Sequence, residues 1–309
     1  MGNADIPPGY EALRGVIGRE RLSTLNAPDD GPAAAQDVGV DWYRDIGEII
    51  DGLGSEALPE RLVRGLAHLV PFELAAVFAY RGRSRPLVVY DNFDTRGAKQ
   101  GVAAYVENTY VLNPFYHAHL KGLEDGVYRM RDLAPDAFFE SEYYRAYKAR
   151  ASTAEEIGYV TDNWPPGMEE LMVAVTLGDG VLAEISLSRP RRGGGFDDAD
   201  VARLAAVVPV IGALLRKYWA EFGASGSHSS PPDSRVDDAF ADFGKSVLTG
   251  RECEVTQLIL RGHSSESICA NLGISLGTVK THRKNAYAKL AISSQSELLA
   301  RFLQSLKAA

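Results

Sequence analysis

Two lysines stand one helical turn apart in the segment TVKTHRKN, with a threonine next to the first. At 100° per residue, Lys280, Thr281 and Lys284 fall on one side of a helix. A lysine there can reach guanine O6 and N7 or a phosphate, and a threonine can offer its methyl group to thymine. That side suits the major groove of DNA, although lysines at this spacing also occur on ordinary solvated surfaces. The surrounding elements must distinguish the two interpretations.

Polar residues and glycines mark the ends of two short helices before this segment. Thr249 and Glu252 have the T-x-x-E spacing of a capping box, so we expect a helix that begins there and ends at Gly262. Ser264 can cap a second helix, and Gly273 can end it. Two helices joined by so short a glycine-containing turn must cross steeply.

A third helix carries the two lysines. Ser275 offers a side-chain oxygen to the free N–H groups at its start. Val279, Ala286 and Leu290 point to the side opposite the lysines. Lys289 lies on the flank, where we expect at most a modest, sequence-independent contribution to DNA binding. Each local signal agrees with one helix-turn-helix motif, which favours DNA binding over a solvated surface.

The same segment resembles a known family. The strings LTGRECEV, SICANLGIS, TVKTHRKN and AYAKL, together with the turn at Gly262, are similar to the LuxR/GerE/FixJ-type helix-turn-helix domain over residues 246–307. The resemblance implies a four-helix DNA-binding domain in which residues 265–284 form the helix-turn-helix unit. Cys269, Gly277 and Ala291 depart from the family pattern, Ala291 at a position where glycine is usual.

The resemblance also implies roles for individual residues. The positions matched by Lys280, Thr281 and Lys284 face the bases in that family. Those matched by Thr278 and His282 lie near the backbone phosphates. The fourth helix of the family pairs two copies.

Charge is distributed unevenly along the chain. Residues 245–309 hold 9 Lys and Arg and 4 Asp and Glu, a net charge of +5. Residues 1–244 hold 24 basic and 37 acidic residues, a net charge of −13, and the two parts together give −8. A small DNA-binding module on an acidic regulatory domain would have this asymmetry.

Other classes of protein are disfavoured. Cys253 and Cys269 are the two cysteines, both on expected inward helix faces, which fits structural packing in a reducing cytoplasm. We expect no secretory signal and no membrane span, because the longest uncharged apolar run, 204–215, has 12 residues.

We expect neither an enzyme nor a cofactor, because no Ser-His-Asp setting, nucleophile elbow, P-loop or catalytic carboxylate pair is recognisable. His117 and His119, followed by Glu124 and Asp125, have weak metal-ligand spacing. We expect these two histidines to be exposed to solvent, with no metal bound.

Composition divides the chain into four parts. Residues 1–38, rich in Pro, Gly, Ala and Asp, are expected to be flexible, and residues 39–222 form a sensor and dimerisation domain. Residues 223–245 are rich in Gly, Ser and Pro and then acidic, as in a linker that lets domains move. Residues 246–309 form the helix-turn-helix domain.

The sensor domain is expected to be an antiparallel sheet flanked by helices. Helices are expected at 41–53, 58–69, 101–110, 135–150 and 196–219, the last bent or interrupted at Pro209. Strands are expected at 72–80, 86–93, 127–133, 155–164, 169–177 and 181–189, with residues 113–126 irregular. This α+β pattern is similar to GAF/PAS-type sensor folds, so the fold class is a GAF/PAS-like α+β domain followed by an all-α domain.

Aromatic residues are dense in one region of the sensor domain. Ten of the 25 Tyr and Phe residues lie between residues 105 and 147. They could line a pocket with apolar walls and a few phenolic hydroxyls, or they could form core and surface packing. If there is a pocket, the expected ligand contacts are Tyr105, Tyr110, Phe115, Tyr116 and Tyr144.

One class of ligand is disfavoured. The acyl-homoserine-lactone-binding branch of the family has a W-x-x-x-Y motif and an Asp-Pro whose carboxylate accepts from the ligand amide. Here Asn113 stands before Pro114, and W-x-x-x-Y is absent.

The predicted function is transcriptional regulation in a bacterial cytoplasm. The N-terminal domain would sense a signal, which we expect to be a small molecule other than an acyl-homoserine lactone, and would control the DNA reader. Alternatively, the domain docks a protein or dimerises and takes no ligand, or an enzyme is fused to the reader. The expected partners are double-stranded operator DNA, a second copy and, for an activator, RNA polymerase, with no membrane.

Dimerisation is expected from the fourth helix of the C-terminal domain. Its apolar stripe is too broad for one small domain to bury alone, so we predict a homodimer. The stripe consists of Leu298, Leu299, Phe302, Leu303 and Leu306.

Overall fold

The computed structural model describes residues 40–94, 96–144, 168–191, 194–223 and 235–308. Residues 1–38 and the strand expected at 155–164 lie outside these ranges. Among the helices in these ranges, none has the length and hydropathy of a membrane span.

A five-stranded antiparallel sheet forms the centre of residues 40–223, the N-terminal half of the structure, in the order β2-β1-β5-β4-β3. Its strands are β1 (Leu74–Arg81), β2 (Leu87–Asp91), β3 (Gly126–Arg129), β4 (Met168–Gly178) and β5 (Val181–Pro190). Both expected hairpins are present, and Asp179 takes φ 52° in the turn between β4 and β5. The predicted antiparallel sheet flanked by helices is confirmed.

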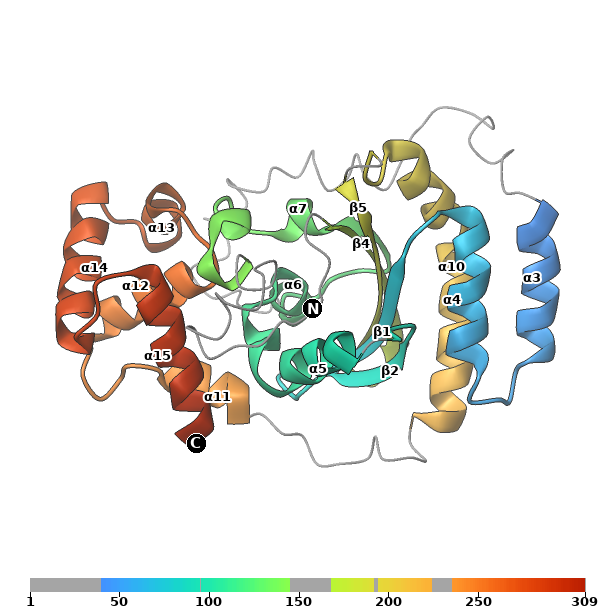
Figure 1. Cartoon of the computed structure of the whole chain (residues 1–309), viewed down its shortest axis with the longest axis horizontal. Helices are drawn as coiled ribbons and strands as arrows, with labels where there is room; N and C mark the ends of the chain where they lie inside the picture. Colours follow the sequence, from blue (N-terminus) through green and yellow to red (C-terminus); the bar gives the residue numbers. More distant parts are fainter. Residues whose placement is uncertain (1–39, 95, 145–167, 192–193, 224–234, 309) are drawn as a thin grey trace, which may run out of the picture.

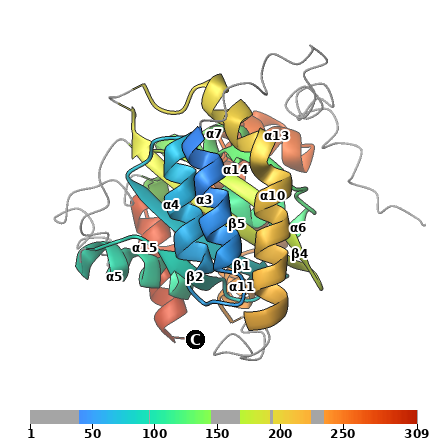
Figure 2. The same cartoon turned by 90° about the vertical axis from the view of Figure 1, so that its right-hand side faces the viewer.

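Each face of the sheet is covered by a different group of helices. Val77, Val173 and Ile185 point to one face, which α4 (Leu58–Leu69) and α10 (Asp198–Phe222) cover, with α3 (Val40–Asp51) outside them (Figures 1 and 2). Phe78 and Tyr80 point to the other face. There the chain forms α5 (Arg96–Ala104), the π-helix η2 (Tyr105–Thr109), the 3-10 turn η3 (Tyr110–Leu112) and α6 (Pro114–Leu120).

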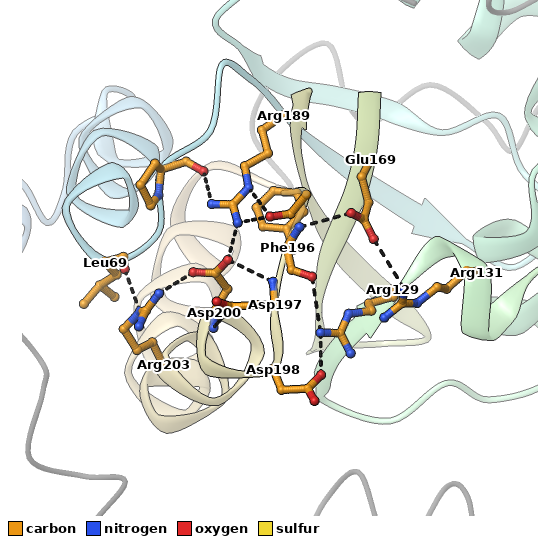
Figure 3. A network of polar contacts seen from close by, with 12 residues as sticks. Leu69, Arg129, Arg131, Glu169, Arg189, Phe196, Asp197, Asp198, Asp200 and Arg203 are labelled. Carbon is orange, nitrogen blue, oxygen red and sulfur yellow. Dashed lines mark hydrogen bonds and ion pairs between the residues drawn. The ribbon is translucent and has the colours of Figure 1, made fainter. Parts of the chain in front are cut away.

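A network around a buried carboxylate holds the start of α10 against the sheet (Figure 3). Asp200, 2% exposed, forms ion pairs with Arg189 of β5 and with Arg203, three residues further along α10. The Arg203 Nε also donates to the Leu69 carbonyl of α4, at 3.1 Å. The side chain of Asp197 caps the helix by accepting from the Asp200 N–H, at 2.8 Å. These contacts fix α10 relative to both α4 and the sheet.

Two sequence expectations for this half need correction, and a third holds in part. Helix α10 is not interrupted at Pro209, which lies on its exposed side, so the unpaired carbonyl of Ala205 can bond to water. Residues 114–120 form α6 rather than an irregular stretch, because Asn113 caps the helix and Pro114 suits its first turn. The strand expected at 127–133 is shorter, since β3 ends at 129 and α7 (Met130–Leu133) follows.

The helix expected at 135–150 is described only in its first part. Residues 135–144 contain the 3-10 turn η4 (Phe138–Glu140) and then helical residues at 142–144. The remainder lies outside the described residues.

The C-terminal half is helical from residue 235. Its elements are α11 (Arg235–Asp242), α12 (Gly250–Leu260), α13 (Ser265–Leu272), α14 (Leu276–Leu290) and α15 (Gln295–Ala308). Thr249, Ser264 and Ser275 cap α12, α13 and α14 as the sequence predicted. Gly273, with φ 64°, ends α13 in the left-handed conformation.

The apolar stripe of α15 is already covered within one chain. Phe302 is 0% exposed and packs against Phe240 of α11 and against Phe243, with ring centroids 5.2 and 5.5 Å apart. The expectation that this stripe needs a second copy to cover it is therefore wrong, because α11, within the segment 223–245 expected to be a linker, packs on it. The homodimer itself stays a prediction.

Ala291 ends α14 in a conformation that is costly for an L-residue. Its φ is 54°, and its side chain is exposed. The left-handed region costs a non-glycine residue roughly 1–2 kcal/mol, partly offset in a glycine variant by the greater entropy of its unfolded chain.

We therefore predict that Ala291→Gly raises the free energy of unfolding of the C-terminal helices by about 0.5–1 kcal/mol. Ala288→Gly is the matched control, because Ala288 is exposed in the body of α14 and its replacement should cost about 1 kcal/mol. Urea unfolding of both variants measures the difference. Equal destabilisation by the two substitutions would contradict the prediction.

Candidate functional site

Helix α14 presents a basic side to solvent at one end of the molecule. Val279, Ala286 and Leu290 are 1%, 0% and 7% exposed, so the inward side is as predicted. Lys280 and Lys284 are exposed, and neither pairs with an acidic residue in the part of the chain that the structure describes. In Figure 1, α14 forms the edge of the molecule farthest from α3. The side of α14 that is expected to contact DNA is thus exposed to solvent.

The polar residues beside the lysines differ in their exposure and in the hydrogen bonds that already engage them. Thr281 is exposed, and its hydroxyl donates to the Gly277 carbonyl at 2.9 Å, so its methyl group and hydroxyl lone pairs remain available. The hydroxyl of Thr278 lies 2.8 Å from that of Ser275, within the cap of α14. His282 is half-buried. All of them lie on α14, but Thr278 also has a structural contact.

Lys289 has a structural role that the sequence analysis missed. Its Nζ lies 2.7 Å from Oε2 of Glu252, whose side chain is 4% exposed, so this pair joins α14 to α12. The hydrogen bond from Lys289 is the main cause that lowers the pKa of Glu252 to about 2. The expectation that Lys289 contributes at most modestly to DNA binding stays a prediction.

The turn before α13 contacts the N-terminal half. The N–H and hydroxyl of Ser264 both donate to the Asp136 carboxylate, the N–H at 3.0 Å. The Ala137 N–H donates to the Gly262 carbonyl at 3.1 Å. A Cβ on Gly262 would stand 2.5 Å from the Cα of Phe138, and the φ of Gly262 is 90°. The C-terminal helices therefore dock through the turn before α13, which leaves α14 free.

A second contact between the halves involves a buried carboxylate of α11. Asp237, 7% exposed, accepts from the Tyr116 hydroxyl at 2.8 Å and from the Arg83 guanidinium at 2.9 Å. Part of the segment expected to be a mobile linker is thus a helix fixed to the N-terminal half.

A small cavity lies on the α5 side of the sheet. Its volume is about 30 Å³, and residues of β1, β4, β5 and α5 line it together with Asn113 and Tyr105. Of the five aromatic residues named as ligand contacts, Tyr105 lines it. Tyr110, Phe115 and Tyr116 are each 0% exposed in the core, and Tyr144 packs on Phe138 and Phe139. For these four, the packing interpretation is the one that the structure supports.

The polar centre of this cavity was missed by the sequence analysis. Glu184 of β5 is 3% exposed, and its Oε2 accepts from the Tyr80 hydroxyl at 2.6 Å. The Tyr80 hydroxyl also lies 2.7 Å from that of Tyr105, which accepts from the Asn113 amide at 3.0 Å. The alternation of β5 was the available signal, because Leu182, Glu184 and Ser186 must share one face of a strand buried on both sides.

His117 and His119 are half-buried rather than exposed, contrary to expectation. His117 Nε2 lies 2.7 Å from the Val111 carbonyl, and burial is the main cause that lowers its pKa well below the usual value. Among the described residues, no group of three or more His, Cys, Asp or Glu could hold a metal ion.

An α+β half joined to a helix-turn-helix unit with an uncovered basic helix defines a two-part DNA-binding regulator. Residues 246–302 match the family described as "Bacterial regulatory proteins, luxR family". Over 200 residues the chain is 31% identical to the "Putative HTH-type transcriptional regulator in exeN 3'region" of Aeromonas salmonicida, covering 63% of this chain and 94% of that protein. The protein belongs to the luxR family of transcriptional regulators.

Two further proteins are similar to this chain at lower sequence identity. The "Monoamine regulon transcriptional regulator" of Klebsiella aerogenes is 24% identical over 248 residues, covering 80% of this chain and 91% of that protein. The crystal structure of the VqsR LBD domain from Pseudomonas aeruginosa aligns with a TM-score of 0.46 at 21% identity, covering 59% of this chain and 99% of that one.

We predict that Lys289→Ala lowers the free energy of unfolding by about 1 kcal/mol at pH 7, because it leaves the buried Glu252 carboxylate without its cation. The pKa of Glu252 is depressed in the folded protein, so the stabilisation is present above pH 4.5 and is lost as the pH falls through about 2. The variant should therefore approach the parent in stability as the pH falls toward about 2. Urea unfolding at pH 7 and at about pH 2, with Lys284→Ala as the exposed control, tests this. Equal effects of the two substitutions at pH 7 would refute it.

Proposed function

We propose that the protein recognises an operator on double-stranded DNA through α14. Lys280, Thr281 and Lys284 would contact base edges, and Thr278 and His282 would lie near phosphates. The observation that carries the proposal is the uncovered basic side of α14 in a luxR-type domain. The net charge of +5 in residues 245–309 supports it, because counterion release adds affinity for any DNA sequence.

The N-terminal half is proposed to sense a small molecule and to control the reader. The buried polar chain from Asn113 to Glu184 beside a cavity supports a ligand site, since such sites combine apolar walls with a few placed polar groups. A sheet covered by helices also supports the GAF/PAS-like prediction. A second candidate, a docking or dimerisation module without a ligand, is favoured by the cavity volume of about 30 Å³.

The signal is proposed not to be an acyl-homoserine lactone. Asn113 stands where that branch of the family has its carboxylate, and its Oδ1 accepts from the Phe115 N–H at 2.8 Å to cap α6. Its Nδ2 donates to Tyr105. Both ends of this amide are engaged, which supports a different ligand.

Control is proposed to act on the position of the reader rather than by covering it. The acidic N-terminal half contacts the turn before α13 and leaves the lysines of α14 exposed. Docking would therefore restrict where each reader can lie on DNA. A ligand could release the docked reader only by binding the undocked arrangement more tightly than the docked one.

We predict that Lys280→Ala and Lys284→Ala each weaken binding to the cognate duplex by roughly 1–3 kcal/mol and reduce discrimination against a scrambled duplex. Lys217→Ala removes the same charge from the exposed side of α10 and should change neither quantity. Titration of both duplexes at two salt concentrations measures the effects. Equal losses on the two duplexes would mean that the lysines contact phosphate alone.

The same titration tests the homodimer. Two chains per duplex at saturation are expected, with half-sites about 10 bp apart or a multiple of that spacing. One chain per duplex would contradict the dimer.

For control, we predict that Asp136→Ala strengthens DNA binding by the ligand-free protein roughly fivefold, because it removes two hydrogen bonds to Ser264 worth about 1 kcal/mol in docking. Asp132→Ala, an exposed carboxylate nearby, should leave the affinity unchanged. Unchanged or weaker binding by Asp136→Ala would contradict positional restraint by this contact.

A further inference from the structure

The cavity on the α5 side of the sheet contains acidic groups without a basic one. Its polar lining residues are Tyr105, Asn113, Glu170, Glu184, Ser186 and Ser188, so no Lys, Arg or His is among the described residues that line it. The rings of Phe78 and Phe93 form part of its apolar wall. Such a lining repels an anion, and it presents the Glu184 carboxyl group and the Phe78 ring to a cation.

The hydrogen bonds around the cavity all point toward Glu184. The Asn113 amide is fixed because its Oδ1 accepts from the Phe115 N–H, so its Nδ2 must donate to the Tyr105 oxygen. Tyr105 then donates to Tyr80, and Tyr80 donates to Oε2 of Glu184. A carboxyl oxygen at the end of such a chain is prepared to carry negative charge.

No cation neutralises the Glu184 carboxyl group in the part of the chain that the structure describes. Tyr80 is the hydrogen-bond partner of Glu184, through Oε2, and no described Lys or Arg forms an ion pair with this carboxyl group. Burial is the main cause that raises the pKa of Glu184 to about 8, although the Tyr80 hydrogen bond lowers it, and Glu170 raises it further. At neutral pH, most molecules without a ligand therefore hold this carboxyl group protonated.

We propose that this cavity binds the ammonium group of a small primary amine, with Glu184 as its anionic partner. This proposal rests on the proposed sensing function and specifies its ligand class. The volume of about 30 Å³ admits an ammonium-sized head group but not the apolar body of the ligand. The apolar body must therefore displace the α5 side of the wall, where Phe93 and Val102 lie. Binding then exchanges the proton of the carboxyl group for the ammonium cation.

Calorimetric titration of the full chain with 2-phenylethylamine tests this, with 2-phenylethanol and 3-phenylpropanoate as the neutral and anionic analogues. The amine should bind at least tenfold more tightly than either analogue. With a pKa of about 8 for Glu184, about 0.9 proton should be released at pH 7, measured in buffers of different ionisation enthalpy. The affinity should rise about fiftyfold from pH 6 to pH 8 and then level off, because the ionised carboxylate is the form that binds.

Variants assign the effect to Glu184. Glu184→Gln should abolish the preference for the amine and the pH dependence, whereas Glu107→Gln, an exposed residue of η2, should change neither. If Glu184→Gln does not fold, Tyr80→Phe gives a second test. Loss of its hydrogen bond should raise the pKa of Glu184 and move the pH dependence to higher pH.

The results separate this proposal from the sensing function. Equal binding of the amine and the alcohol, no proton release, or an affinity that falls as the pH rises toward 8 would overturn the amine assignment and leave sensing intact. If none of the three compounds binds and no member of a mixed library of neutral, acidic and basic metabolites raises the melting temperature of the chain, both proposals fail.

Discussion

A buried carboxylate needs hydrogen-bond donors close to it, and the donors to Asp237 of α11 come from the N-terminal half. Tyr116 and Arg83 supply these donors, and loss of either would leave a buried acceptor unsatisfied at a cost of about 1–3 kcal/mol. The pairing fixes α11 on the N-terminal half. Phe240, on the same helix, then covers Phe302 of α15 and receives the Arg261 guanidinium over its ring, 4.9 Å from the centroid. The packing of the DNA reader thus depends on a contact that the reader does not make itself.

The cavity and this contact share one group of side chains. The Tyr116 ring lies 6.4 Å from that of Tyr80, and the Tyr80 hydroxyl donates to Glu184 at the cavity. A rearrangement at Glu184 would therefore reach Asp237 through two packed aromatic residues. Physical continuity alone does not produce control, because a ligand shifts an equilibrium only by its difference in affinity for two arrangements. These contacts place the cavity and the α11 end of the C-terminal helices in one packed cluster, so two arrangements of the cluster would differ at both places.

The sequence predicted what depends on neighbours along the chain and missed what depends on distant ones. The caps at Thr249, Ser264 and Ser275 each involve a residue three positions away, so their spacing alone was sufficient. The pairs Lys289 with Glu252, Tyr80 with Glu184 and Tyr116 with Asp237 are separated by 37, 104 and 121 residues. No local pattern specifies such partners, and for the same reason the cover of the α15 stripe by α11 was missed. The aromatic cluster was recognisable by composition, but which ring meets a cavity depends on the tertiary fold.

Two buried carboxyl groups of the N-terminal half differ in whether a cation neutralises them. Asp200, 2% exposed, is neutralised by Arg189 and Arg203, and its network holds the start of α10 against the sheet. Glu184, 3% exposed, receives a tyrosine hydroxyl and no described cation. A charge buried without a partner costs stability, and a protein can avoid the cost by an apolar residue of similar volume. Glu184 avoids this cost in another way, because burial raises its pKa to about 8 and keeps most of the carboxyl group protonated at neutral pH. Acids with pKa values shifted this far concentrate at functional sites.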